Sequence, residues 1–536
     1  MTETKRKNQP QLSTSFSKIV AGSSPVNRLA LLFCLASTLH CLSGIASHAG
    51  QADVTATRES IEMPSGCGLI PIGRLKPRCS REIASNRWNI SCAALDRDYT
   101  IYDNYKAYLG PLGAKSARIA GGWAKTEHKK GKYDFTWIDS VVNDLRDQGM
   151  HTWFGLRYGN PIYNGGGGYD LGAGLPSSPE GLSAWDNYVR ATVRHFRDRV
   201  FYWEIWNEPN GGAGRKDNAP EQYGDLFIRT AEIIRELQPE SRIAGLSTAG
   251  IPLGYIKSFL DHLQAHGKLG LIDEVSFHLK PVIPDAKYAA VEKLQALVAM
   301  YSSRIVVIQG ENGCPSVPKG QDLMALRQYD WTETSQAKWY LRDMLGDYAR
   351  GIPHAIFTMI DIHYPQGVLH KGLLAATPDK RVDHPKLSYS AVQNAITIFD
   401  DTFERITNVS YRLEPIPLGA DTSMRQKTKG KDPFVFHAFK KKDSQQSLFA
   451  TWRSDQRPAH EFPIVAMKIT YTGSVLQDPV CVDLLSGRVY EIAKAQWSVQ
   501  DVTYTFQNIP VYDSPILIIE RSLLHTVKPP APTSQQ

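Results

Sequence analysis

An alternation of two kinds of segment, running from Arg87 to about Glu404, constrains the fold of this chain more than any other feature. Short apolar runs typical of buried strands alternate with longer stretches whose apolar residues recur every three or four positions, as in amphipathic helices. The strand-like runs are residues 88–95, 115–122, 151–159, 200–207, 242–250, 273–280, 304–311 and 354–361. The clearest helical stretches are residues 136–149, 183–198, 222–238 and 335–350. Eight strand–helix pairs in about three hundred residues predict an α/β fold, a (β/α)8 TIM barrel over residues 87–405.

A doubly wound open sheet is the structural alternative to the barrel. Such a sheet usually carries a glycine-rich phosphate loop that opens a helix. The glycine run at 165–168 follows Asn164 in a loop and opens no helix. The barrel is therefore the favoured fold.

The pattern changes after Phe403, where helical periodicity ends. Short alternating runs follow, separated by turn residues, at 434–439, 447–452, 465–471, 481–487, 502–509 and 514–520. They predict a small C-terminal β-sandwich over residues 406–524. The last residues, 525–536, are rich in Pro, Ser and Gln and are expected to be disordered. Residues 50–86 have no strong period and are expected to form an irregular N-terminal extension.

The first 49 residues predict a secretion signal. A basic, Ser-rich stretch ends at Arg28, and an apolar run follows from Leu29. The small residues Gly44 and Ala46, or Ser47 and Ala49, then offer cleavage sites. A membrane anchor is the alternative, but Ser37, Thr38, His40 and Ser43 interrupt the apolar run. Lipid attachment at Cys41 is a weaker possibility. We expect a secreted or periplasmic protein without a stable membrane span after cleavage.

The chain's net charge of +7 does not indicate a nucleic-acid partner. The predicted signal holds five basic residues and one acid, so the rest carries 56 basic and 53 acidic residues, a net of +3. Nucleic-acid binding requires a concentrated basic face. Five cysteines follow the signal, of which Cys67 and Cys79 are the plausible local pair, and the odd number leaves at least one thiol free. No metal-ligand spacing stands out, and we expect neither a metal nor a cofactor.

Two glutamates follow predicted strands of the barrel directly. Glu208 ends the fourth strand in WEIWNEPN, and Glu311 ends the seventh in VVIQGENG. In a TIM barrel the catalytic groups stand at the carboxyl ends of the strands, so both side chains are expected at the same rim. Glycoside hydrolysis requires such a pair, with one carboxyl protonated to assist the leaving oxygen and the other ionised to attack the anomeric carbon or to activate water.

These motifs resemble those of glycoside hydrolase clan A. WNEPN at 206–210 is similar to the motif of β-xylosidases and α-iduronidases. The stretch RIAGGWAKTEHKKGKYDFTWIDSVV at 118–142 resembles a run of clan A β-xylosidases and β-galactosidases, and the likeness extends to PKLSYSAVQN at 385–394. The resemblance implies that Glu208 is the acid/base and Glu311 the nucleophile of a retaining enzyme.

The same resemblance implies roles for residues around the pair. Asn207 would bind the sugar hydroxyl next to the anomeric carbon, Arg118 would hold Glu311 ionised, and His278 would border the same subsite. Further candidate pocket-lining residues, each of which could equally be core or loop packing, are Trp123, Tyr158, Asn160, Trp206 and His363.

Three positions depart from the clan pattern. Thr358 or Met359 stands where a Trp usually forms a floor for the sugar, Cys314 follows the nucleophile closely, and Lys280 replaces a Tyr two residues after His278. Lys280 is expected either to pair with a local acid such as Glu311 or to meet an acidic sugar. These departures leave the sugar open.

The function expected from the sequence is double-displacement hydrolysis of O-glycosidic bonds in an oligo- or polysaccharide. The alternatives are an inactive, carbohydrate-binding barrel and a transglycosidase that uses the same residues. An inactive barrel usually loses one glutamate of the pair, and this chain has both.

Overall fold

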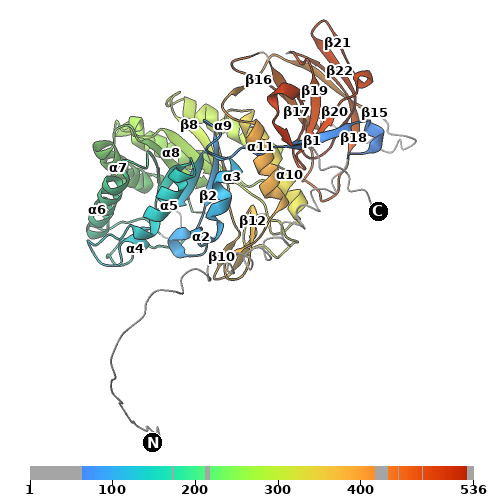
Figure 1. Ribbon diagram of the computed structural model, residues 1–536. Coiled ribbons are helices and arrows are strands. Elements are labelled where there is room, and N and C mark those ends of the chain that lie inside the picture. The colour runs from blue at the N-terminus through green and yellow to red at the C-terminus, as the bar shows by residue number, and fades with distance from the viewer. Residues whose placement is uncertain are drawn as a thin grey trace, which may run out of the picture. The chain divides into compact units, whose positions relative to one another are not determined.

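Eight parallel strands close into a barrel in the computed structural model of the chain (Figure 1). The structure describes residues 63–171, 174–211, 218–416, 433–444, 446–473 and 475–527. The predicted signal at 1–49 and nearly all of the predicted disordered tail lie outside these residues. The barrel strands are β2 (Trp88–Cys92), β3 (Ser116–Ala120), β4 (His151–Leu156), β5 (Tyr202–Ile205), β6 (Arg242–Ala249), β7 (Glu274–His278), β8 (Val306–Glu311) and β9 (His354–Ile356). Each lies inside one of the eight predicted runs, so the TIM barrel is confirmed.

The helices that surround the barrel account for the long amphipathic stretches. They are α5 (Thr136–Asp147), α6 (Pro179–Phe196), α7 (Pro220–Leu237), α8 (Leu253–Ala265), α9 (Tyr288–Ala299), α10 (Glu333–Tyr348) and α11 (Leu387–Ile398). Helix α6 shows how the sequence sets a boundary, because the Ser178 hydroxyl accepts a hydrogen bond from the Gly181 N–H and Pro179 occupies the first turn.

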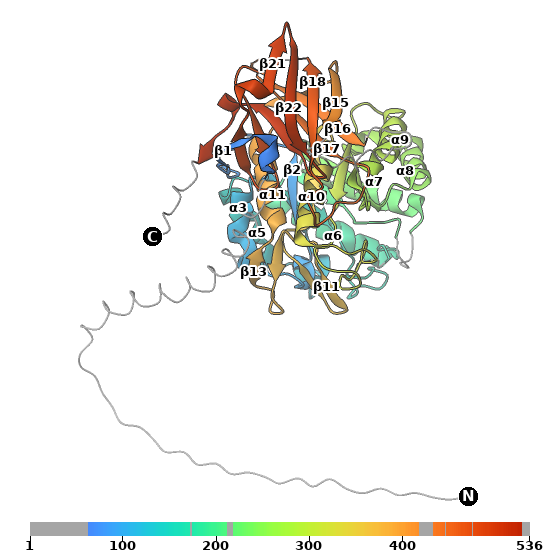
Figure 2. The same cartoon turned by 90° about the vertical axis from the view of Figure 1, so that its right-hand side faces the viewer.

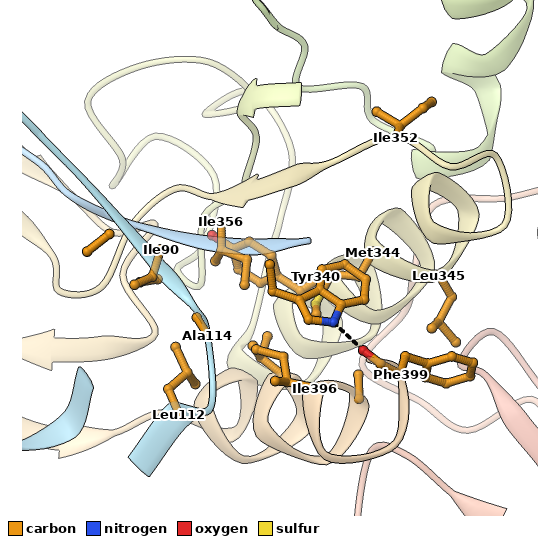
Figure 3. Packing of buried hydrophobic residues seen from close by; sticks show 14 of the residues in the cluster. Ile90, Leu112, Ala114, Tyr340, Met344, Leu345, Ile352, Ile356, Ile396 and Phe399 are labelled. Carbon is orange, nitrogen blue, oxygen red and sulfur yellow. Dashed lines mark hydrogen bonds between the residues drawn. The ribbon is translucent and has the colours of Figure 1, made fainter. Parts of the chain in front are cut away.

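Apolar side chains fill the space between the strands and the last two helices (Figure 3). Ile90 of β2 and Ile356 of β9 pack with Met344 of α10 and Ile396 of α11 in one buried cluster. The indole N–H of Trp88 donates to the backbone oxygen of Phe399 at 2.6 Å. The end of α11 is thereby tied to the first barrel strand.

The C-terminal region forms two antiparallel sheets (Figure 2). The larger sheet has the order β14 (Phe403–Ile406), β16 (Phe434–Lys441), β17 (Ser447–Arg453), β23 (Ile516–Glu520), β19 (Pro479–Asp483), β20 (Arg488–Glu491), β1 (Ile70–Leu75) and β24 (Thr526–Val527). The smaller sheet has the order β15 (Ser410–Ile416), β18 (Val465–Thr472), β22 (Thr503–Val511) and β21 (Trp497–Gln500). The predicted β-sandwich is confirmed.

Strand β1 shows that the sandwich also uses residues that precede the barrel. Ile70 pairs with Glu491 of β20, and Leu75 pairs with Thr526 of β24. The sequence signal for a strand here is weak because Pro71 and Gly73 interrupt a run of six residues and the register shifts between them. Part of the 50–86 stretch, expected to be irregular, therefore completes the larger sheet.

Helix α10 lies between the barrel and the sandwich. Every residue from Thr334 to Asp347 is buried, including Lys338 and Arg342. Lys338 Nζ lies 2.7 Å from Asp513 Oδ1, and Arg342 Nη2 donates to the Ser454 backbone oxygen at 2.8 Å. Because two cations of a barrel helix find their partners in the C-terminal region, the two parts share one interior.

The described cysteines form no disulfide. Cys67, Cys79, Cys92, Cys314 and Cys481 all carry free thiols, so the suggested Cys67–Cys79 pair is absent. Burial and the neighbouring Asp483 and Cys67 raise the pKa of the Cys481 thiol.

Among the described residues, none of the helices combines the length and the apolar character needed to cross a membrane.

Candidate active site

Glu208 stands just beyond the carboxyl end of β5, where the backbone leaves the extended conformation. Trp206 has φ +66° and Glu208 has φ +48°, both in the left-handed region that residues other than glycine seldom adopt. The Glu208 N–H donates to the backbone oxygen of Ser247 at 2.9 Å, which fixes the turn against β6. Strained backbone of this kind concentrates at functional sites.

Glu311 is the last residue of β8, and its two carboxylate oxygens bind two different cations. Arg118 Nη1 donates to Oε1 at 2.7 Å, and Lys280 Nζ donates to Oε2 at 3.2 Å. The Arg118 side chain is fully buried, while those of Glu311 and Lys280 are 11% and 16% exposed. Of the two expectations for Lys280, the structure thus shows the pairing with Glu311.

His278, at the end of β7, joins the two glutamates. Its Nδ1 lies 3.0 Å from Glu208 Oε1 and 3.6 Å from Glu311 Oε2. One ligand atom from each of the three residues lies within 4.8 Å of those of the other two. The structure therefore brings together at one rim the two carboxylates that the sequence placed there.

A buried polar network supports Asn207 and Arg118 from below. Glu204 of β5 is fully buried and accepts from Arg118 Nε at 2.9 Å and from Arg157 Nη1 at 3.2 Å. The same two arginines donate to Asn207 Oδ1 at 2.8 Å each. The Ser247 hydroxyl also donates to Glu204. With its oxygen occupied, Asn207 has only its amide N–H groups to offer toward a ligand.

The pKa values of both glutamates are lowered. Burial alone would raise the pKa of Glu311, but the positive charges of His278, Lys280 and Arg118 hold it well below its usual range. Burial and the charge of Glu311 also raise the pKa of Glu208, yet the hydrogen bond and charge of His278 outweigh them and lower it. Glu311 is therefore firmly ionised, whereas the pKa of Glu208 is set by the balance between burial and the charge of Glu311, which raise it, and the hydrogen bond and charge of His278, which lower it.

Three candidate pocket-lining residues, Trp123, Asn160 and Trp206, are buried packing residues instead. Trp123 is fully buried and stacks on Tyr163 and Tyr188, with ring centroids 5.7 and 5.6 Å apart. Asn160 is 1% exposed and donates to the Glu127 backbone oxygen at 2.8 Å.

Trp206 is the third of them. It is 1% exposed and packs edge-on against Trp185 of α6 at 5.9 Å. The left-handed backbone at Trp206 interrupts strand alternation, so this ring enters the layer between barrel and helices while Glu208 reaches the rim. Tyr158, in contrast, lies close enough to Glu208 for that carboxylate to help raise its pKa.

Two residues near the glutamates, Tyr364 and Phe357, belong to no motif of the sequence. Tyr364, in the short strand β10 (Ile362–Tyr364), interacts electrostatically with Glu311 and Tyr158. Phe357, just after β9, lies under the Lys280 ammonium at 5.0 Å, close to where the clan usually has its Trp. His363, the remaining candidate, has a buried Nε2 without a hydrogen-bond partner among the described residues.

Within the part of the chain that the structure describes, two groups of side chains have the composition of a metal site. The first group consists of Glu208, His278 and Glu311. The side chains of Arg118 and Lys280 pair with Glu311 and already balance its negative charge. The second group, Asp343, Asp347 and His354, surrounds the buried Lys287 ammonium, which lies 2.7 and 2.8 Å from the two aspartates. Each group thus contains protein cations where a metal ion would supply charge.

The barrel and the paired glutamates after its fourth and seventh strands define the class of clan A TIM-barrel glycosidases. Within that class, residues 119–307 match the family model described as "Glycosyl hydrolases family 39". The predicted resemblance to clan A and the predicted glycosidase class are thereby confirmed. The match includes Glu208 and ends before Glu311, so the role of Glu311 depends on geometry.

The chain is also similar to individual known glycosidases in sequence and in fold. The chain is 26% identical over 156 residues to a β-xylosidase of Geobacillus stearothermophilus, covering 27% of this chain and 30% of that protein's length. Among solved structures it resembles a family 39 glycoside hydrolase from Bacteroides cellulosilyticus WH2, with a TM-score of 0.56, 16% identity and 81% of both chains covered. A monomeric β-xylosidase from Caulobacter crescentus CB15 has a TM-score of 0.53 at 16% identity, with 83% of this chain and 97% of that chain covered. At these identities the solved structures support the fold.

Proposed function

We propose that this protein is a retaining glycoside hydrolase that cleaves O-glycosidic bonds of an oligo- or polysaccharide through a glycosyl–enzyme intermediate. The observation that carries the proposal is the pair Glu208 and Glu311, whose nearest oxygens lie within 4.8 Å of each other around His278. Retaining enzymes hold their carboxyl groups about 5–5.5 Å apart, whereas inverting enzymes need about 6.5–9.5 Å to admit a water.

Glu311 acts as the nucleophile in this proposal. Arg118 and Lys280 each hold one of its oxygens, so the carboxylate is ionised and fixed in orientation when a sugar arrives. Attack on the anomeric carbon forms an ester bond to Glu311 and breaks the bond to the leaving oxygen.

Glu208 acts first as the acid and then as the base. Its Oε1 shares a proton with His278 Nδ1 at 3.0 Å, and this proton passes to the leaving oxygen. The negative charge of Glu311 raises the pKa of Glu208. Ester formation removes that charge, so the pKa of Glu208 falls at the moment when it must deprotonate the attacking water.

Asn207 supports the proposal from the side of the substrate. Its Oδ1 is occupied by Arg118 and Arg157, which turns the amide N–H groups into the available donors. A hydroxyl next to the anomeric carbon is an acceptor that such a donor would bind.

The roles of the two glutamates are tested by removing each carboxylate separately. Glu311→Ala should abolish turnover of every aryl glycoside. Glu208→Ala should keep the first step on a substrate with a good leaving group and accumulate the ester, and added azide should restore turnover as a glycosyl azide of retained configuration. Glu292→Ala, an exposed glutamate of α9, is the matched control and should behave as wild type.

Two results would contradict these roles: an inverted azide product from Glu208→Ala, or azide rescue of neither variant. The test also separates the alternatives. A binding-only barrel would show no turnover in the wild type, and a transglycosidase would transfer the sugar to an added glycan in preference to water. Because the curated relative is named a β-xylosidase, aryl β-xylosides are the first substrates to screen.

We also infer that the protein is exported to the periplasm or the medium. The inference depends on the basic and apolar segments of residues 1–49. Mass spectrometry of the mature protein should find an N-terminus near Ser47 or Gly50, whereas a soluble cytoplasmic form that retains Met1 would contradict export.

A further inference from the structure

The loop that follows β2 places an acid and a base side by side at the catalytic rim. It contains the short helical turn η2 (Leu95–Arg97), with left-handed residues at Ala94 (φ +62°) and Asp98 (φ +56°) on either side. Gly122, at the carboxyl end of β3, lies directly against Asp96, because a Cβ atom there would be 2.8 Å from the Asp96 Cβ. Asp96 and Arg97 are thus held at the end of the barrel where Glu208 and Glu311 stand.

Arg97 is nearly buried, and one of its donors is unused. Its side chain is 8% exposed, and the guanidinium lies over the rings of Tyr158 at 5.1 Å and Tyr99 at 5.4 Å. Its buried Nε is 3.3 Å from Asp96 Oδ2 but has no hydrogen-bond partner among the described residues. A buried guanidinium normally uses most of its five donors.

Asp96, in turn, has a buried acceptor that no donor satisfies. Its side chain is 3% exposed, and Oδ1 is a buried acceptor without a hydrogen-bond partner among the described residues. An unmet buried carboxylate oxygen next to an unmet guanidinium N–H costs free energy that a bound polar group would recover.

Two tyrosines connect this pair to the glutamates. Tyr158 interacts electrostatically with Asp96, Arg97 and Glu208. Tyr364 interacts with the same Asp96 and Arg97 and with Glu311. The Asp96–Arg97 pair and the two glutamates therefore act electrostatically on the same two tyrosines.

We propose that Asp96 and Arg97 form a hydroxyl-reading subsite, in which Arg97 donates to and Asp96 accepts from hydroxyl groups of the sugar held between Glu208 and Glu311. A hydroxyl both accepts and donates, so it satisfies the two side chains together. A carboxylate or sulfate would satisfy Arg97 but would be repelled by Asp96, so the pair selects a neutral part of the sugar. This subsite deepens the proposed glycosidase function and rests on it.

The test is a set of double-mutant cycles that combine a protein variant with the removal of one hydroxyl from the substrate. Wild type, Asp96→Asn and Arg97→Lys are assayed on an aryl β-xyloside and on its monodeoxy analogues. Each variant should lose about 10- to 150-fold in kcat/KM on the parent, as expected for a hydrogen bond to a charged group. On the analogue that lacks the hydroxyl bound by the pair, the variants and the wild type should have similar kcat/KM values. Asp98→Asn, an exposed neighbour in the same loop, should show no such selectivity.

Equal losses on the parent and on all deoxy analogues would overturn the inference, because damage to the fold does not distinguish hydroxyl groups. A loss confined to an aryl glucuronide compared with its glucoside would also overturn it, since the pair would then read an anion. If the wild type turns over no aryl glycoside, the proposed function fails, and the subsite is decided by saturation-transfer NMR with xylose and its deoxy forms. In that measurement, the deoxy sugar must bind the wild type more weakly than xylose does, whereas the two sugars must bind Asp96→Asn alike.

Discussion

His437 makes the folded protein sensitive to acid, and the structure sets the size of the effect. The residue lies on β16, is 7% exposed, and packs against Trp452 with ring centroids 5.5 Å apart. Neither ring nitrogen has a hydrogen-bond partner among the described residues. Burial, together with the positive charges of Arg350 and Arg405, lowers the pKa of His437 to about 3 from its ordinary value of 6.5. The folded protein therefore holds this imidazole neutral.

The stability that depends on His437 is present above pH 6.5 and is lost as the pH falls, because the unfolded chain takes up the proton first. Each pKa unit corresponds to about 1.4 kcal/mol, so the free energy of unfolding drops by about 3 kcal/mol at pH 4.5 and by about 4 kcal/mol at pH 3, where half of the folded molecules also bind the proton. A loss of that size is a large part of the 5–15 kcal/mol that typically holds a domain together.

Replacement of His437 by leucine, a non-titrating side chain of similar size, should remove this part of the acid sensitivity. Urea unfolding of wild type and His437→Leu, followed from pH 8 to pH 4.5, should give curves of stability against pH that diverge by about 3 kcal/mol. His384 provides a control of opposite sign, since hydrogen bonds to Glu333 and Asp383 raise its pKa to about 9 and its stabilisation is lost as the pH rises. Parallel curves for wild type and His437→Leu would refute the reasoning, as would an NMR titration of His437 near pH 6.5.

Three further predictions concern the active site. His278→Asn removes a positive charge that lowers the pKa of both glutamates. The acidic and basic limits of the kcat/KM–pH profile should therefore both move to higher pH. A profile that stays in place would contradict the charge assigned to His278. Lys280→Met should reduce kcat/KM on an aryl glucuronide and on the matched glucoside alike, because Lys280 acts through Glu311; a selective loss on the glucuronide would instead favour an acidic sugar. Glu204→Gln removes the fully buried carboxylate that Arg118 and Arg157 share, which leaves Arg118 paired with Glu311 alone, and should cost about 3–5 kcal/mol of stability in urea unfolding. A variant as stable as wild type would count against that network.

The barrel was predictable because parallel strands covered on both faces require continuous apolar runs, and seven of the eight runs here are followed by a longer helix. Glu208 and Glu311 were predictable for the same reason, since each directly follows such a run. Strand β1 was not, because a six-residue edge segment with Pro71 and Gly73 has no period to recognise.

The other residues of the site depend on tertiary contacts that no local pattern encodes. Asp96, Arg97 and Tyr364 lie in the segments that follow β2 and β9, and barrel closure, which pairs β2 with β9, brings those segments together. Trp206 was a candidate for the pocket that could equally be a packing residue. The left-handed backbone at Trp206 and Glu208, which sends the ring into the packing, is not visible in the sequence.

Lys280 shows how a departure from the clan pattern can preserve a role. The usual tyrosine would offer one neutral donor near the nucleophile, whereas Lys280 offers a charged donor 3.2 Å from Glu311 Oε2 while Arg118 occupies Oε1 at 2.7 Å. A carboxylate bound by two full cations is a weaker base and hence a weaker nucleophile, but it is also a better leaving group from the glycosyl ester. In the proposed double displacement, the exchange would therefore favour the second step at the expense of the first. The proposed first step would then depend all the more on the proton that Glu208, hydrogen-bonded to His278, supplies to the departing oxygen.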